Sequence, residues 1–175
     1  MARNNEFIKG NLGQPSAAIF SVDERGDKSN HVTVLQVDST LPAIAGGASL
    51  AVGKLLYTFP AGAIIVRGAH MNIAITQTDG NIDADTPDIG IGTTIASGAV
   101  AVLGGTSAFE NILTGQTATD CDGTPTVKTV DAALVIEAAG DHTVYLNVAD
   151  GWAASGDAGA LIQGTVTLEW TYLSA

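Results

Sequence analysis

The sequence predicts an all-β protein, an antiparallel β-sandwich of jelly-roll type with an extended N-terminal arm. Apolar and polar residues alternate with period two in several segments, as they do in half-buried strands. The composition combines 46% hydrophobic residues with 21 glycines and only 14% charged residues, which favours short strands and tight turns over long helices. An up-and-down barrel is the alternative architecture.

The chain of 175 residues suits one domain with a single core. Residues 1–30 are rich in Asn, Gly and charged residues, and we interpret them as the extended arm, leaving 31–175 as the β-sandwich domain. Two apolar pairs of the arm follow no sustained period and would dock on a neighbouring subunit: Phe7-Ile8 and Ile19-Phe20. A frayed terminus is the alternative for the arm.

The strand signals after the arm are rich in β-branched residues and are separated by Gly, Pro and Asp. They lie at 31–37, 55–59, 63–77, 86–95 and 98–105, in two stretches of 130–150, and at 162–172. Within 63–77, Gly68 indicates a possible bulge. The last segment has the clearest alternation, with Ile162, Val166, Leu168, Trp170 and Tyr172 on one face.

One short surface helix is expected at 107–114. Ser107 and Glu110 match a capping box, in which two side chains bond the free backbone N–H groups of the first turn. Gly115 supplies a helix stop.

The charge balance excludes several kinds of partner. Seven basic residues stand against 18 acidic ones, so the net charge of −11 repels nucleic acid and anionic membrane surfaces. Four of the seven basic residues lie within the first 28 positions, which makes the arm electrostatically distinct. The start of the sequence lacks the apolar core of a signal peptide, and no apolar run is long enough to cross a bilayer.

Residues that could carry catalysis are few and scattered, so we expect no enzyme activity and no cofactor. His31, His70 and His142 have no metal-ligand spacing and are interpreted as strand residues at a sheet surface. Cys121 is the only cysteine, so the chain has no intrachain disulfide, which fits a reducing cytosol. Asp120 and Asp122 flank it and would raise the pKa of its thiol.

A loop at 79–88 concentrates oxygen ligands that would suit a hard cation: Asp79, Asn81, Asp83, Asp85 and Asp88. The spacing departs from an EF-hand, because Ala84 stands where the glycine belongs and Gly90 where the glutamate belongs. We therefore expect a solvated turn and no bound metal.

Two tryptophans could suggest a platform for sugar stacking. Trp170 lies on the apolar face of the last predicted strand, where core packing is the better interpretation. Trp152 lies in the loop sequence ADGWAASGD and could contact a neighbouring molecule.

The run from YTFPAGAIIVRGAHMNIAITQ through SAFENILTGQTATDCDGT to DHTVYLNVADGWAASGD and VTLEWTYL resembles structural proteins of tailed bacteriophages. The likeness covers about residues 55–173 and rests on the order of these phrases and on composition. The nearest kind is the capsid decoration or cement protein. The resemblance implies a β-sandwich or jelly roll with a terminal arm, which usually sits as a trimer on the capsid exterior.

We therefore expect a virion structural protein that is assembled in the bacterial cytoplasm, binds the major capsid protein at the outer surface of the head and self-associates as a trimer. The absence of nucleic-acid and membrane partners agrees with the charge. Contact with the capsid or another partner is expected at Phe7, Ile8, Lys9, Ile19, Phe20 and Trp152. A phage fibre or tail component and a carbohydrate-binding module are the alternatives.

Overall fold

The computed structural model describes residues 13–27, 29–43, 51–78, 82–98, 100, 102–104, 108–151 and 159–173. Ten strands and no helix are found among these residues, so none of them forms a helix that could cross a membrane. The strands are β1 (Gln14–Pro15), β2 (Ile19–Gly26), β3 (Asn30–Thr40), β4 (Val52–Thr58), β5 (Ile64–Gln77), β6 (Asp88–Gly92), β7 (Leu113–Thr117), β8 (Asp122–Ile136), β9 (Thr143–Ala149) and β10 (Ala160–Tyr172).

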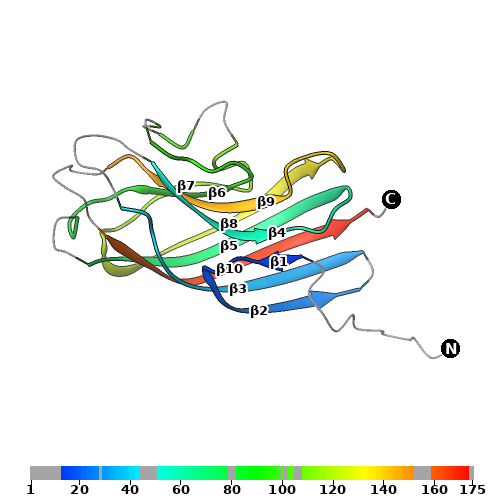
Figure 1. Cartoon of the computed structure of the whole chain (residues 1–175), viewed down its shortest axis with the longest axis horizontal. Helices are drawn as coiled ribbons and strands as arrows, with labels where there is room; N and C mark the ends of the chain where they lie inside the picture. Colours follow the sequence, from blue (N-terminus) through cyan, green and yellow to red (C-terminus); the bar gives the residue numbers. More distant parts are fainter. Residues whose placement is uncertain are drawn as a thin grey trace.

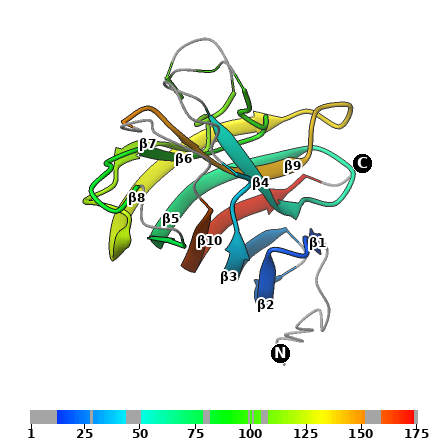
Figure 2. The same cartoon turned by 60° about the vertical axis from the view of Figure 1, so that its left-hand side comes forward.

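The strands form two packed antiparallel sheets, which confirms the predicted β-sandwich (Figures 1 and 2). Sheet A has the order β1-β4-β9-β6-β7, and sheet B has the order β2-β3-β10-β5-β8. The predicted alternation of the last segment explains the packing. Val166, Leu168 and Trp170 of β10 point between the sheets and are at most 1% exposed, whereas Gln163 and Glu169 are exposed on the outer face.

Pairing between strands β3 to β10 is nested. The first strand pairs with the last, β3 with β10, and the second with the second last, β4 with β9. In the same way β5 pairs with β8, and β6 with β7. From the outermost pair to the innermost, the two paired strands are separated by fewer residues of the sequence. Residues 93–112 connect the two strands of the innermost pair, β6 and β7.

The central strands agree with the sequence analysis. β3 covers the segment predicted at 31–37, and β4 and β5 overlap those predicted at 55–59 and 63–77, although β4 ends at Thr58 and β5 begins at Ile64. The predicted bulge is present, because the register of β5 shifts between Val66 and Gly68 against β8, and Gly68 and Val66 face consecutive residues of β10.

The strand predicted at 98–105 and the helix predicted at 107–114 are both wrong over their described residues. The described residues of 98–105 form no strand, only an isolated bridge between Gly98 and Ala51. Residues 108–114 form no helix, because Ile112 and Leu113 are buried in the main core and Leu113 begins β7. Tertiary pairing with β6 overrides the local capping signal.

The described residues of the segment 93–112, here named the covering loop, lie across the outer face of sheet A at the top of Figure 1. Asn147 of β9 is fully buried beneath the loop. Its side-chain oxygen accepts the N–H of Ala96 at 2.8 Å, and its amide donates to the carbonyls of Thr94 at 3.0 Å and Phe109 at 2.7 Å. A second apolar cluster of Ala51, Ala96, Leu103 and Ala149 seals the contact.

The predicted arm is corrected over its described part. β1 and β2 are edge strands of sheets A and B, so residues 13–27 belong to the sandwich. Ile19 packs against the main core, and β2 pairs with β3 over seven aligned positions. The sequence did not predict strand β2, because only one face of an edge strand is buried, and its apolar residues are therefore few and irregularly spaced. Residues 1–12 lie outside the described residues.

Candidate interaction surface

The two outer faces of the sandwich differ. The covering loop lies on sheet A, whereas the outward side chains of sheet B alternate with buried ones and are exposed or partly exposed. Three valines on this face are among the exposed large apolar residues: Val32 at 39%, Val127 at 57% and Val135 at 52%. Sheet B therefore offers a broad, regular surface for another protein.

Charged side chains on this face are few and of both signs. Arg25 of β2 makes an ion pair with Asp23 on the same strand. Arg25, Val32, Arg67 and Glu169 line a shallow groove of about 340 Å³ that crosses β2, β3, β10 and β5. The face therefore lacks the strong negative charge of the chain as a whole, and another acidic protein could approach it with little repulsion.

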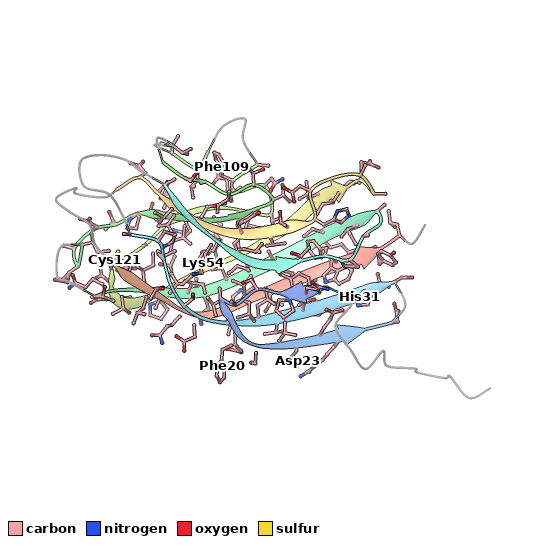
Figure 3. The ribbon with its side chains drawn as sticks, in the orientation of Figure 1. Phe20, Asp23, His31, Lys54, Phe109 and Cys121 are labelled. Atoms are coloured by element: carbon pink, nitrogen blue, oxygen red, sulfur yellow. The ribbon has the colours of Figure 1, made fainter. Side chains whose placement is uncertain are left out.

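Phe20 is the most exposed large apolar residue described, at 81%. It lies on edge strand β2, where the register against β3 shifts between Ile19 and Ser21. The shift turns one residue away from the regular alternation, and Figure 3 shows the Phe20 ring pointing away from the sandwich. An exposed aromatic ring on an edge strand is a suitable anchor for a partner.

The six predicted contact residues thus separate into three groups. Phe20 is exposed, whereas Ile19 is partly buried against the core, and the contact role of both residues stays a prediction. The remaining four lie outside the described residues: Phe7, Ile8, Lys9 and Trp152.

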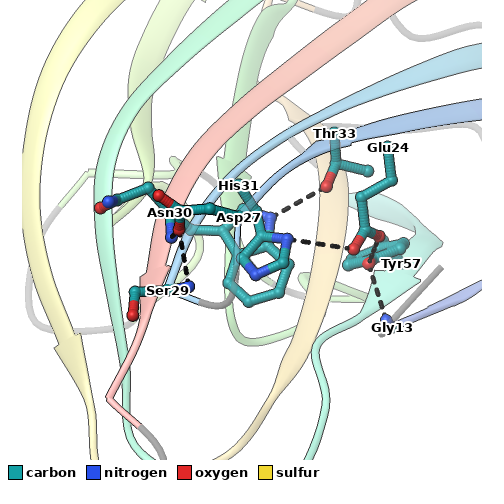
Figure 4. Close-up of polar contacts among 9 residues, drawn as sticks. Gly13, Glu24, Asp27, Ser29, Asn30, His31, Thr33 and Tyr57 are labelled. Carbon is teal, nitrogen blue, oxygen red and sulfur yellow. Dashed lines mark hydrogen bonds and ion pairs between the residues drawn. The ribbon is translucent and has the colours of Figure 1, made fainter. Parts of the chain in front are cut away.

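A buried polar network joins the two sheets at the end where β1 begins (Figure 4). The Tyr57 hydroxyl donates to Glu24 at 2.7 Å and accepts the backbone N–H of Gly13 at 3.0 Å. His31 Nδ1 lies 3.4 Å from the other carboxyl oxygen of Glu24, and both side chains are only 3% exposed. The His31 ring also stacks on Trp170, with ring centroids 4.3 Å apart.

The three histidines were all predicted to lie at a sheet surface, but they differ in burial. His31 is buried, so the prediction of a surface position is wrong for it. His70 does lie on the outer face of sheet B, where its Nδ1 is 2.5 Å from the Thr129 hydroxyl. His142 lies just before β9, with Nε2 2.6 Å from the Gly62 carbonyl. Alternation along the sequence indicates which residues share one face of a strand. Whether that face is buried depends on the other segments that pack against it.

The opposite end of the sandwich, here named the aspartate end, gathers the β5–β6 and β7–β8 connections. Asp83 accepts the Gln77 side-chain amide at 2.7 Å, and Asp88 accepts the Thr117 hydroxyl at 2.8 Å. Asp88 and Thr117 are paired positions of β6 and β7. Residues 82–85 form a turn, in which the Asp85 N–H bonds the Ile82 carbonyl at 3.0 Å, but Asp85 is buried, so the prediction of a solvated turn is wrong at this residue. Asp79 and Asn81 lie outside the described residues, and no group of three metal-ligating side chains occurs within the part that is described.

Cys121 is buried at the aspartate end, where its backbone N–H bonds the Asp83 carbonyl at 2.9 Å. Burial is the main cause that raises the pKa of its thiol to about 12, and the charges of Asp85, Asp120 and Asp122 add to it. This agrees with the effect predicted for the flanking aspartates. A thiol in this state is a poor nucleophile at neutral pH.

Cys121 should therefore react at pH 8 with a small maleimide at least about 100-fold more slowly in the folded protein than in urea. Because its folded pKa lies above the unfolded one, ionisation of this thiol should also lower stability as the pH rises from about 9 towards 12. Thiol labelling followed by mass spectrometry measures the first effect, with urea-unfolded protein as the reference. Equal rates in the two states would contradict the buried position.

Trp170 confirms the prediction of core packing. It is 1% exposed, packs edge-on against Phe59, and donates its indole N–H to the Thr33 hydroxyl at 2.9 Å. Its ring is therefore unavailable to stack on a sugar.

Comparison of the chain with models of protein families, with curated proteins and with solved structures finds no match.

Proposed function

We propose that this protein is a virion structural protein without enzymatic activity, a decoration or cement protein on the outer surface of a tailed-phage head. The observation that carries the proposal is the asymmetry of the sandwich. A loop of the chain itself covers sheet A, whereas sheet B keeps a broad, weakly charged face with Phe20 at its edge. Such a surface suits docking on another protein.

Two further features support the same proposal. The nested pairing of β3 to β10 places β3, β10, β5 and β8 in one sheet and β4, β9, β6 and β7 in the other, which supports the jelly-roll type of sandwich that the sequence predicts. Jelly rolls recur in viral capsid and lectin domains, which is an argument by analogy of fold. The resemblance of residues 55–173 to tailed-phage structural proteins favours the viral role.

A cement protein acts by mass action. Bound to the major capsid protein at junctions of the assembled shell, it stabilises that shell against dissociated or ruptured states. Self-association as a trimer would add avidity, because three linked copies contact three neighbouring shell subunits. The net charge of −11 suits a position on the exterior, away from the packaged nucleic acid.

Attachment is assigned to residues 1–12 together with the β2 edge. Deleting 1–12 should leave the sandwich folded and weaken capsid binding at least about tenfold, since Phe7, Ile8 and Lys9 are lost. A longer deletion is unsuitable as a test, because β1 and β2 belong to the sheets. Co-sedimentation with capsids that lack this protein measures the affinity.

Phe20→Ser should weaken the same binding at least about fivefold, since the loss of an aromatic anchor commonly costs more than about 1 kcal/mol. Val102→Ser is the matched control, because Val102 is also exposed, at 53%, but lies on the covering loop.

Cryo-electron microscopy of the virion locates the protein. Density on the tail or a fibre, or equal binding by all variants, would contradict the proposal.

A further inference from the structure

The buried polar network holds the first described residue of the chain. Gly13 donates its N–H to the Tyr57 hydroxyl, and the next two residues, Gln14 and Pro15, pair with Thr58 and Tyr57 as β1. A Cβ atom at position 13 would lie 2.2 Å from that hydroxyl oxygen and 2.5 Å from the Thr58 carbonyl. The close approach of chain and hydroxyl therefore requires glycine at this position.

The hydroxyl is itself held by the opposite sheet. Tyr57 belongs to sheet A, and its bond to Glu24 of β2 reaches sheet B. Burial, followed by the neighbouring Glu24 carboxyl, raises the pKa of the Tyr57 phenol, so the hydroxyl stays protonated and remains a donor. Its proton is thus directed to Glu24, and its oxygen is left to accept from Gly13.

The position of Gly13 is at the end of the sandwich away from the aspartate end. β4 ends there at Thr58, and the β2–β3 turn and the end of β10 meet there through the bond from Tyr172 N–H to the Ser29 carbonyl at 2.6 Å. β1 and the end of β10 lie on the right in Figure 1, whereas the β5–β6 and β7–β8 connections lie on the left.

We propose that Tyr57 is a positioning residue whose hydroxyl fixes the point at which residues 1–12 leave the sandwich. Its bonds join β1, β2 and β4, so the segment starts from one rigid site at the end opposite the aspartates. Resting on the proposed function, this geometry means that the segment which reaches the shell starts at the end of the sandwich opposite the aspartate end.

The test compares Tyr57→Phe with Tyr172→Phe in the full-length protein. Tyr172 is the matched control, because its hydroxyl also makes one backbone bond at this end, to the Ala61 carbonyl at 2.9 Å. Amide hydrogen exchange should become at least about tenfold faster for Gly13 and Ser16 in Tyr57→Phe, and change little in β5 and β9. Tyr172→Phe should leave Gly13 and Ser16 unchanged.

A second variant, Gly13→Ala, keeps Tyr57 and its bond to Glu24 while the added methyl group displaces the start of the chain. It should reproduce the fast exchange at Ser16 with an unchanged thermal midpoint. Unchanged exchange in both variants, or equal acceleration across β1, β5 and β9, would overturn the assignment. Local acceleration with undiminished capsid binding would uphold the role of Tyr57 and count instead against attachment through residues 1–12.

Discussion

Asn147→Asp should lower the free energy of unfolding by about 3–5 kcal/mol at neutral pH, the range for a buried charge without a partner. The wild-type amide donates to the carbonyls of Thr94 and Phe109 from a fully buried position. A carboxylate has no proton for either carbonyl, and its charge would face both oxygens. Urea denaturation followed by far-ultraviolet circular dichroism measures the loss.

The matched control is Asn72→Asp, which adds the same charge on the exposed face of β5 and should cost less than about 0.5 kcal/mol. Burial should raise the pKa of the carboxyl introduced at position 147. The penalty should therefore be present at neutral pH and shrink as the pH falls and the carboxyl takes up a proton. Equal stability of the two variants would mean that Asn147 does not hold the covering loop.

Gly164→Ala should also destabilise strongly, by about 3–5 kcal/mol, which combines backbone strain with overpacking. Gly164 lies in central strand β10 with a φ of 138°, a conformation that side chains rarely adopt. An added Cβ would lie 2.1 Å from the Asn72 carbonyl oxygen on β5, so neighbouring backbone must move. The thermal midpoint should fall by roughly 10 °C for a chain of this length.

Gly98→Ala separates the two causes of that loss. Gly98 also has a positive φ, 62°, but nothing lies within 4 Å of a Cβ placed there. Only the backbone cost of about 1–2 kcal/mol should remain. If both substitutions lowered the thermal midpoint equally, the close contact between β10 and β5 would not be the cause.

The sequence alone predicted the elements whose burial repeats every second residue. The apolar face of β10 and the bulge near Gly68 in β5 could both be predicted, because the buried face of a central strand appears in the sequence as a regular alternation of apolar and polar residues. The choice of a two-layer sandwich followed from many such strands and few helical signals. The tendency of Asp120 and Asp122 to raise the pKa of Cys121 was equally local, since the three residues are adjacent.

The tertiary structure alone decided what covers each face. The segment 93–112 carries apolar groups that predict a strand or a helix locally, but Asn147, far away in the sequence, binds Thr94, Ala96 and Phe109 of its described part as a loop over sheet A. The burial of His31 depends in the same way on Glu24 and Trp170 from two other strands. Periodicity is a property of neighbours along the chain, whereas strand pairing and covering are contacts between distant segments. Only the folded chain therefore shows that no described loop covers the outer face of sheet B and that the Tyr57 hydroxyl binds the backbone of Gly13.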